Sequence, residues 1–120
     1  MPIRRVVPTI RTAASPRAAM ERNTEFYGLL GFREVMNHGW IMTLASPSQP
    51  SAQLSIVAAD ATAPVTPDLS VEVDDVDAAY ATLREKGAEI VYPLHDEDWG
   101  VRRFFVRDPN GRVVNVLSHR

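Results

Sequence analysis

The alternation of apolar and polar positions divides the chain into short strand-like segments and two helical ones. Residues 4–12 are rich in β-branched side chains and contain a proline, which an edge or first strand tolerates. A helix is predicted next, with Ser15 as N-cap, Pro16 at the first helical position and Gly31 at its end. Its apolar stripe consists of Met20, Phe26 and Leu30. The chain is therefore expected to begin with a strand and a helix.

From residue 32 onward the apolar pattern changes to a period of two. Three short segments, at 32–37, 40–45 and 52–58, are separated by the turn residues His38-Gly39 and by the SPSQPS stretch. This pattern predicts a three-stranded meander. Residues 60–67 (DATAPVTP) contain two prolines and little apolar periodicity, which indicates a linker.

The second half repeats the same order of elements. A strand at 69–75 precedes a helix at 77–86 that Gly87 ends, and three strands follow, at 88–94, 102–108 and 112–118. The turn DPNG joins the last two strands. Each half thus reads β-α-β-β-β with a repeat of roughly sixty residues.

This repeat predicts one α+β domain made of two βαβββ modules in tandem. Module one is expected at 1–59, the linker at 60–67 and module two at 68–120. One helix covers only one face of a four-stranded sheet, so two sheets are expected, with a concave cleft between their other faces that is lined by alternate strand residues.

Composition narrows the class of protein. With 120 residues, 45% hydrophobic and 23% charged, the chain has the composition of a single globular domain. A net charge of −2 with mixed signs favours neither a nucleic-acid nor a membrane partner. The absence of cysteine excludes disulfides, thiolate zinc sites, iron–sulfur clusters and a cysteine nucleophile. Without a long apolar segment or a signal-like N-terminus, we expect a cytoplasmic protein.

Three segments carry a family resemblance. They are FYGLLGF at 26–32, DDVDA at 74–78 and FVRDPNG at 105–111. Together they resemble the vicinal oxygen chelate superfamily, which contains the glyoxalases, bleomycin resistance proteins and extradiol dioxygenases, over nearly the whole chain. The resemblance implies this fold strongly and a function weakly, because the fold hosts isomerases, dioxygenases, epimerases, lyases and antibiotic-binding proteins.

The same resemblance implies four strand positions that bind a divalent cation in the metal-dependent members through His, Gln or Glu. These positions fall here on Pro8, Ser55, Asp68 and Asn115. Only Asp68 is a carboxylate, whereas a tight site needs at least three strong ligands. A displacement by one residue would bring in Val7 or Thr9 in the first strand and Leu69 or Pro67 in the fifth, none of them a usual ligand. We therefore expect neither a metal nor another cofactor, as in the metal-free branch that resembles bleomycin resistance proteins.

The histidines and the loop HDEDWG (95–100) offer other candidates. His38 precedes a turn and His119 is the penultimate residue, so both are expected at the surface, whereas His95 lies in a loop that can cover the cleft and is an alternative general base. The acidic residues 96–98 form either a solvated loop or a rim that attracts a cationic ligand, on which Trp99 would stack. Trp40 is either a core residue or a wall of the pocket.

The strand at 102–108 places two arginines side by side, so that one points into the cleft and the other away. Arg103, Phe105 and Arg107 share one face, while Arg102, Phe104 and Val106 share the other. Because Phe104 and Val106 resemble core residues, Arg103 and Phe105 are predicted to line the pocket, where the arginine would bind a carboxylate or phosphate.

These observations favour a binding protein over an enzyme. We expect a homodimer that binds a small organic molecule in the cleft between its sheets without a metal, for example to sequester an antibiotic. The predicted ligand-binding residues are Trp40, Ser55, Asp68, Trp99, Arg103, Phe105 and Asn115. One alternative is a glyoxalase-type lyase, isomerase or dioxygenase that uses a rearranged metal site, through Asp68 and His95, or metal-free acid–base chemistry. Another is a protein whose cavity is filled by its own Trp40 and Phe105.

Overall fold

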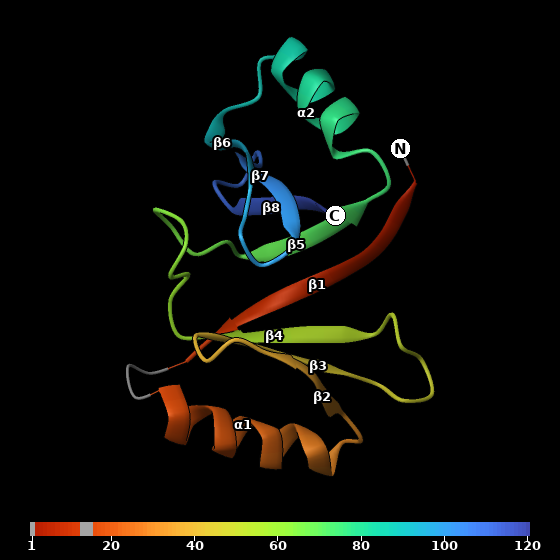
Figure 1. Ribbon diagram of the computed structural model, residues 1–120, viewed down its shortest axis with the longest axis vertical. Coiled ribbons are helices and arrows are strands. Elements are labelled where there is room, and N and C mark those ends of the chain that lie inside the picture. The colour runs from red at the N-terminus through yellow and green to blue at the C-terminus, as the bar shows by residue number, and fades with distance from the viewer. Residues whose placement is uncertain (1, 13–15) are drawn as a thin grey trace.

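Two helices flank one continuous sheet in the computed structural model, which describes residues 2–12 and 16–120 (Figure 1). The first module contains β1 (Ile3–Arg11), α1 (Pro16–Leu29), β2 (Arg33–Asn37), β3 (Ile41–Ala45) and β4 (Gln53–Val57). The second contains β5 (Leu69–Val73), α2 (Val76–Glu85), β6 (Ile90–Asp96), β7 (Val101–Arg107) and β8 (Val113–His119). The predicted α+β class and the two βαβββ modules in tandem are confirmed.

The eight strands form a single sheet in the order β2-β3-β4-β1-β5-β8-β7-β6. Within each module the first strand is parallel to the last, β1 to β4 and β5 to β8. The modules join where β1 pairs antiparallel with β5, so the sheet curls instead of splitting into two. This pairing has a simple cause: β1 and β5 are each the outer strand of a module, and their hydrogen-bonding edges satisfy each other. Among the described residues, the sheet therefore ends at two unpaired edges, β2 and β6.

Each helix packs on its own half of the sheet and buries one core there. Under α2, Val76 and Ala79 contact Phe104, Val106 and Val116, and Phe104 is fully buried. Under α1, the buried cluster consists of Met20, Met42, Leu44 and Ile56. In both modules the apolar core residues of a strand alternate with residues that point to the opposite face of the sheet, as the two-residue period of a strand requires. The face opposite the helices is thus left to form the cleft.

The helix ends follow their local chemistry. Asp75 caps α2, its carboxylate accepting a hydrogen bond from the Ala78 amide at 3.0 Å. Gly31 and Gly87 follow the two helices with φ of 106° and 79°, a conformation that favours glycine. The predicted N-cap of α1, Ser15, lies outside the described residues.

One segment differs from its expected structure. His95 and Asp96 were expected in a loop, but β6 extends to Asp96, and these residues pair with Arg103 and Arg102 of β7. The connection to β7 is correspondingly shorter, at residues 97–100, because both residues continue the ladder instead of leaving it. Trp99 therefore sits in a short connection between adjacent strands.

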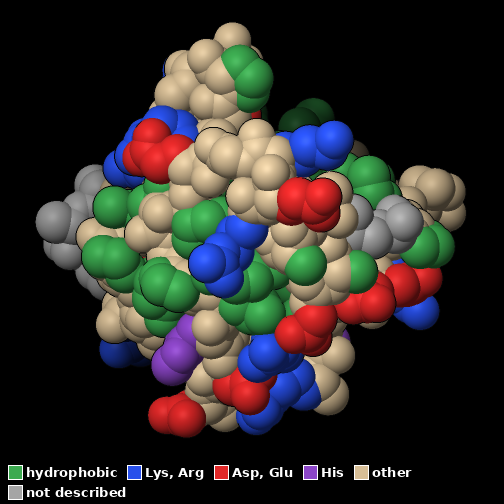
Figure 2. Space-filling model, turned by 90° about the horizontal axis from the view of Figure 1, so that it is seen from above, with side chains coloured by type: hydrophobic (Ala, Val, Ile, Leu, Met, Phe, Trp, Pro, Cys, Tyr) green, Lys and Arg blue, Asp and Glu red, His purple; other side chains and the backbone are tan. Residues whose placement is uncertain are grey.

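The surface carries mixed charge. Figure 2 shows acidic and basic side chains interspersed with hydrophobic ones on the face seen from above. Neither described helix is long and apolar enough to cross a bilayer.

Candidate functional site

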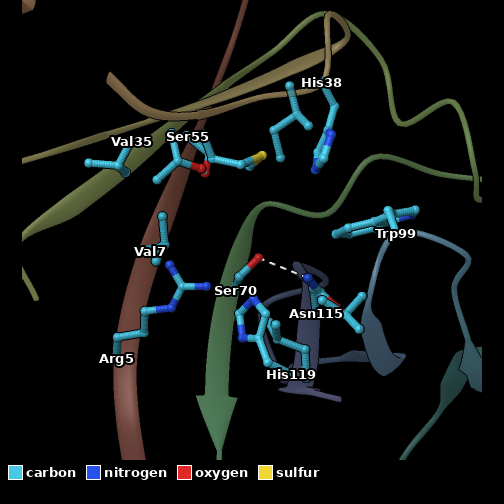
Figure 3. A pocket seen from close by; sticks show the side chains of 14 residues that line it. Arg5, Val7, Val35, His38, Ser55, Ser70, Trp99, Asn115 and His119 are labelled. Carbon is cyan, nitrogen blue, oxygen red and sulfur yellow. Dashed lines mark hydrogen bonds between the residues drawn. The ribbon is translucent and has the colours of Figure 1, made fainter. Parts of the chain in front are cut away.

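A cavity of about 400 Å³ lies on the face of the sheet opposite the helices (Figure 3). Every strand except β6 contributes to it, together with the turn after β2 and the connection before β7. Its lining consists of Arg5, Val7, Val35, Met36, His38, Ile41, Thr43, Ser55, Ser70, Trp99, Val101, Asn115, Leu117 and His119. The cavity has room for a small organic molecule.

The floor of the cavity is formed by one residue from each of the four central strands: Val7, Ser55, Ser70 and Asn115. Val7 pairs with Ser70 across β1 and β5, and Ser70 pairs with Asn115 across β5 and β8. Asn115 Nδ2 donates to Ser70 Oγ at 3.0 Å, and the hydroxyls of Thr43 and Ser55 are 3.1 Å apart. These hydrogen bonds fix the polar side chains of the floor.

Two of the four positions inferred from the family resemblance lie elsewhere. Val7, not Pro8, faces the cavity from β1, because successive side chains point to opposite faces and Pro8 falls on the other one. Asp68 stands just before β5, where its carboxylate accepts from the Val113 amide at 2.8 Å and lies 3.8 Å from Arg112. The residue of β5 that faces the cavity is Ser70, two positions further along.

The side chains of this floor do not fit a divalent cation. A hydrocarbon, two hydroxyls and a neutral amide offer no carboxylate or imidazole, which are the strong ligands of such ions. The Ser55 hydroxyl and the Asn115 amide are also engaged with neighbouring side chains. Across residues 2–12 and 16–120, no three His, Asp or Glu side chains gather closely enough to share a metal.

Asn115 retains an unused acceptor in the floor. Its side chain is 6% exposed, and its Oδ1 atom is buried without a hydrogen-bond partner among the described residues. Burying a carbonyl oxygen without a partner costs about 1–3 kcal/mol. A donor on a ligand in the cavity would supply the missing hydrogen bond.

A chain of polar contacts crosses one end of the floor, over four neighbouring strands. Arg5 of β1 donates to Gln53 of β4 and, through Nε, to Glu72 of β5 at 2.5 Å. Glu72 in turn lies 2.9 Å from Nδ1 of His119 on β8. Burial raises the pKa of Glu72, but the hydrogen bonds and charges of His119 and Arg5 outweigh burial and hold that pKa below its ordinary value. Glu72 is therefore an ionised carboxylate between two basic side chains.

Aromatic rings form a wall at the other end of the cavity. The Trp99 ring lies 5.7 Å from the His38 ring and 5.8 Å from the Trp40 ring, edge to face with the latter. Trp99 and His38 line the cavity, whereas Trp40 supports Trp99 from behind the lining. The Trp99 Nε1 atom is buried without a partner among the described residues. This wall suits a flat apolar group.

Behind Trp99, Arg103 is the centre of a buried ionic cluster. Its guanidinium donates to Asp60 at 2.9 Å, to Glu97 at 2.7 Å and to Thr62 at 2.8 Å. The three charged side chains are between 2% and 5% exposed. The Arg103 guanidinium also lies over the rings of Phe105, Trp99 and Tyr92, at 4.8, 5.0 and 5.7 Å. The cluster attaches the segment between β4 and β5 to β7. Arg103 therefore has a structural role and does not line the cavity.

Of the seven residues predicted to bind a ligand, three line the cavity: Ser55, Trp99 and Asn115. Phe105 is fully buried, and its ring centroid lies 5.0 Å from that of Tyr92. His95, the alternative base, lies 3.5 Å from Glu97 and outside the lining. Sequence reasoning also missed lining residues, among them Arg5, Ser70 and His119. The alternation of side chains along a strand could have indicated two of them, because Arg5 shares a face with Val7, and His119 shares one with Asn115.

The comparisons with known proteins agree on the fold. The family model of the glyoxalase/bleomycin resistance protein/dioxygenase superfamily matches residues 9–116. No curated protein matches the chain. A superfamily member from Vibrio splendidus 12B01 is 16% identical, with 98% of this chain and 99% of that chain covered and a TM-score of 0.68.

Two further solved structures share the fold. Methylmalonyl-CoA epimerase from Mycobacterium tuberculosis is 21% identical, over 98% of this chain and 87% of that chain, with a TM-score of 0.66. The NAD-dependent benzaldehyde dehydrogenase from Legionella pneumophila is 17% identical, over 96% and 97%, with a TM-score of 0.69. The family model spans most of the chain, and the two βαβββ modules agree with it. The chain therefore belongs to the glyoxalase/bleomycin resistance protein/dioxygenase superfamily.

Proposed function

We propose that this chain binds a small organic molecule in the cleft of its curled sheet, and that it does so without a divalent metal. The observation that carries the proposal is the floor of the cavity, where Val7, Ser55, Ser70 and Asn115 offer neither a carboxylate nor an imidazole to a metal. The cavity itself is open, at about 400 Å³, and its buried Asn115 Oδ1 lacks a partner among the described residues. Antibiotic sequestration is one biological role that such binding would serve.

A ligand screen tests this proposal. Differential scanning fluorimetry across antibiotics, keto acids and aromatic catabolites should find compounds that raise the melting temperature, because a ligand that binds only the folded state stabilises it in proportion to RT ln(1 + [L]/Kd). Each hit is repeated with a chelator and with added Zn²⁺, Ni²⁺ or Mn²⁺. We expect the shift to be the same in all of these conditions. A shift that disappears with the chelator and returns with a metal contradicts the proposal.

The second candidate is an enzyme of the glyoxalase type, a lyase, isomerase or dioxygenase with a rearranged or absent metal site. One contact favours metal-free acid–base chemistry: the ionised Glu72 lies 2.9 Å from His119, and His119 lines the cavity. A carboxylate beside an imidazole orients the ring for proton transfer. Elemental analysis of protein purified without chelators separates the metal-dependent form, since a stoichiometric divalent ion would support it. Product formation from a ligand found in the screen would support the metal-free form.

We further propose that the chain forms a homodimer. Its sheet ends at the unpaired edges of β2 and β6, which favour pairing with another chain. Three large apolar side chains near the end of α1, Phe26, Leu29 and Leu30, are also 59%, 83% and 68% exposed. Light scattering at micromolar concentration should give twice the mass of the chain. A monomeric mass at that concentration contradicts the dimer.

A further inference from the structure

The end of the cleft where Arg5, Glu72 and His119 meet carries charges that the proposed function does not use. We propose that this end binds the carboxylate of an organic acid, which the Arg5 guanidinium and the His119 ring would contact. The inference rests on the proposed function, because it assigns a ligand class to the same cleft. Its residues come from β1, β5 and β8, which are adjacent in the sheet.

The His119 ring is oriented by its partner. Glu72 is ionised and can only accept a hydrogen bond, so Nδ1 of His119 donates the hydrogen between them. The other ring nitrogen, Nε2, makes no hydrogen bond within the described part of the chain. The His119 ring lies among the side chains that line the cavity (Figure 3). When it carries a hydrogen, Nε2 is a donor to an anion there.

Arg5 offers a second donor, and its position is fixed. Nε contacts Glu72 and Nη1 contacts Gln53, while Nη2 has no hydrogen bond in the ranges that the structure describes. The Arg5 side chain is 22% exposed and held from both sides, so an anion would meet a guanidinium that is already oriented. A carboxylate between Nη2 of Arg5 and Nε2 of His119 would contact both donors.

The local arrangement of charge suits an anion. Glu72 lies between two basic side chains, Arg5 and His119, and bonds to one nitrogen of each. A bound carboxylate would take the nitrogens that Glu72 leaves unused, Nη2 of Arg5 and Nε2 of His119. The other charged groups around His119 belong to ion pairs of their own, and they are Arg4 with Asp74 and Arg120 with Asp96.

The rest of the cavity lining indicates the polarity and shape of the remainder of the ligand. Val7, Ile41, Val101 and Leu117 provide apolar surface, and the Trp99 and His38 rings provide a flat wall. The unpartnered Asn115 Oδ1 would accept a hydrogen bond from a hydroxyl or amine on the ligand. The ligand class that fits is therefore a carboxylic acid on a flat, mostly apolar body.

The experiment compares acids with their amides, which have nearly the same shape but no charge. Benzoate, 1-naphthoate and indole-3-acetate are titrated beside benzamide, 1-naphthamide and indole-3-acetamide by isothermal titration calorimetry. We expect the acids to bind about tenfold more tightly, because a charge-assisted hydrogen bond is stronger than a neutral one.

Five variants assign the effect to residues. Arg5→Gln should weaken acid binding by about tenfold without changing amide binding. His119→Gln should also weaken acid binding and leave amide binding unchanged. Arg4→Gln, next to Arg5 in sequence but paired with Asp74 at the surface, and His95→Gln, outside the cavity, are the matched controls and should change neither quantity. Arg5→Lys keeps the charge and should lose less affinity than Arg5→Gln, and melting curves show that each variant folds.

The outcomes separate this inference from the proposed function. If amides bind as tightly as acids, or if Arg5→Gln and His119→Gln bind acids as tightly as the unchanged protein, the carboxylate site is wrong while a ligand-binding cleft stands. If neither series binds at all, the result counts against both.

Discussion

Replacing Arg103 by methionine should destabilise the protein severely, because it would leave two buried carboxylates without a partner. Asp60 and Glu97 are 2% and 5% exposed, and every guanidinium nitrogen of Arg103 bonds to one of them. Removing one partner from a buried ion pair costs about 3–5 kcal/mol. With an unfolding entropy of about 2.1 cal/mol/K per residue over 120 residues, this cost lowers the melting temperature by about 12–20 °C.

The measurement is chemical and thermal denaturation followed by circular dichroism, with Arg107→Met as the matched control. Arg107 lies on the same strand and face, but it is 38% exposed and pairs with Glu89, which is 65% exposed, so its loss should cost less than about 1 kcal/mol. The triple variant Arg103→Met, Asp60→Asn, Glu97→Gln should recover part of the loss, since it removes the unpaired charges. If Arg103→Met costs no more than Arg107→Met, the argument from buried charge fails.

Substitutions at three further positions test other parts of the structure. Glu72→Gln should weaken the dependence of the unfolding free energy on pH in acid. The folded protein holds the pKa of Glu72 below its ordinary value of 4.5, so the stabilisation by Glu72 is present above pH 4.5 and is lost as the pH falls through the lower pKa of the folded state. The urea midpoints of the two proteins should therefore converge at low pH. Phe104→Ala should cost about 3–5 kcal/mol in urea denaturation, because Phe104 is fully buried against Tyr80, and a cost below 1 kcal/mol would mean that this core is loosely packed. Asp75→Ala should cost about 1 kcal/mol through loss of the α2 cap, while Asp75→Asn, which keeps an acceptor, should cost less.

Most of the fold could be predicted because local patterns determine it. The period-two segments, the two helix-ending glycines and the DPNG turn each specify an element from a few neighbouring residues. The pairing of β1 with β5 is different, since it joins residues such as Val7 and Ser70 that are far apart in sequence. Nothing local distinguishes two facing sheets from one curled sheet, because both bury the same helical faces.

The site was predicted less well, for a related reason. Placing a residue inside the cleft requires the phase of each strand, and a displacement of one residue moves every side chain to the opposite face. On β1 the phase assigned from the family resemblance selected Pro8 where Val7 faces the cavity. On β5 the phase was correct, but the chosen position, Asp68, lies two residues before Ser70 and just ahead of the strand. Arg103 was placed on the cleft side of β7, but its partner Asp60 is 43 residues away in the segment between modules, so its burial could not be anticipated.

The central claim, a metal-free ligand cleft in the curled sheet, is tested most directly by two-dimensional ¹⁵N NMR of the protein titrated with a screening hit in the presence of a chelator. The chain has two tryptophans, so two indole signals are expected, and Trp99 lies in the cavity wall. We predict saturable shifts of the Trp99 indole, of the Asn115 side-chain amide and of the Ser70 backbone amide, with little change at exposed α2 residues such as Glu85. Shifts confined to residues outside the cavity, or shifts that need an added divalent metal, would contradict the account.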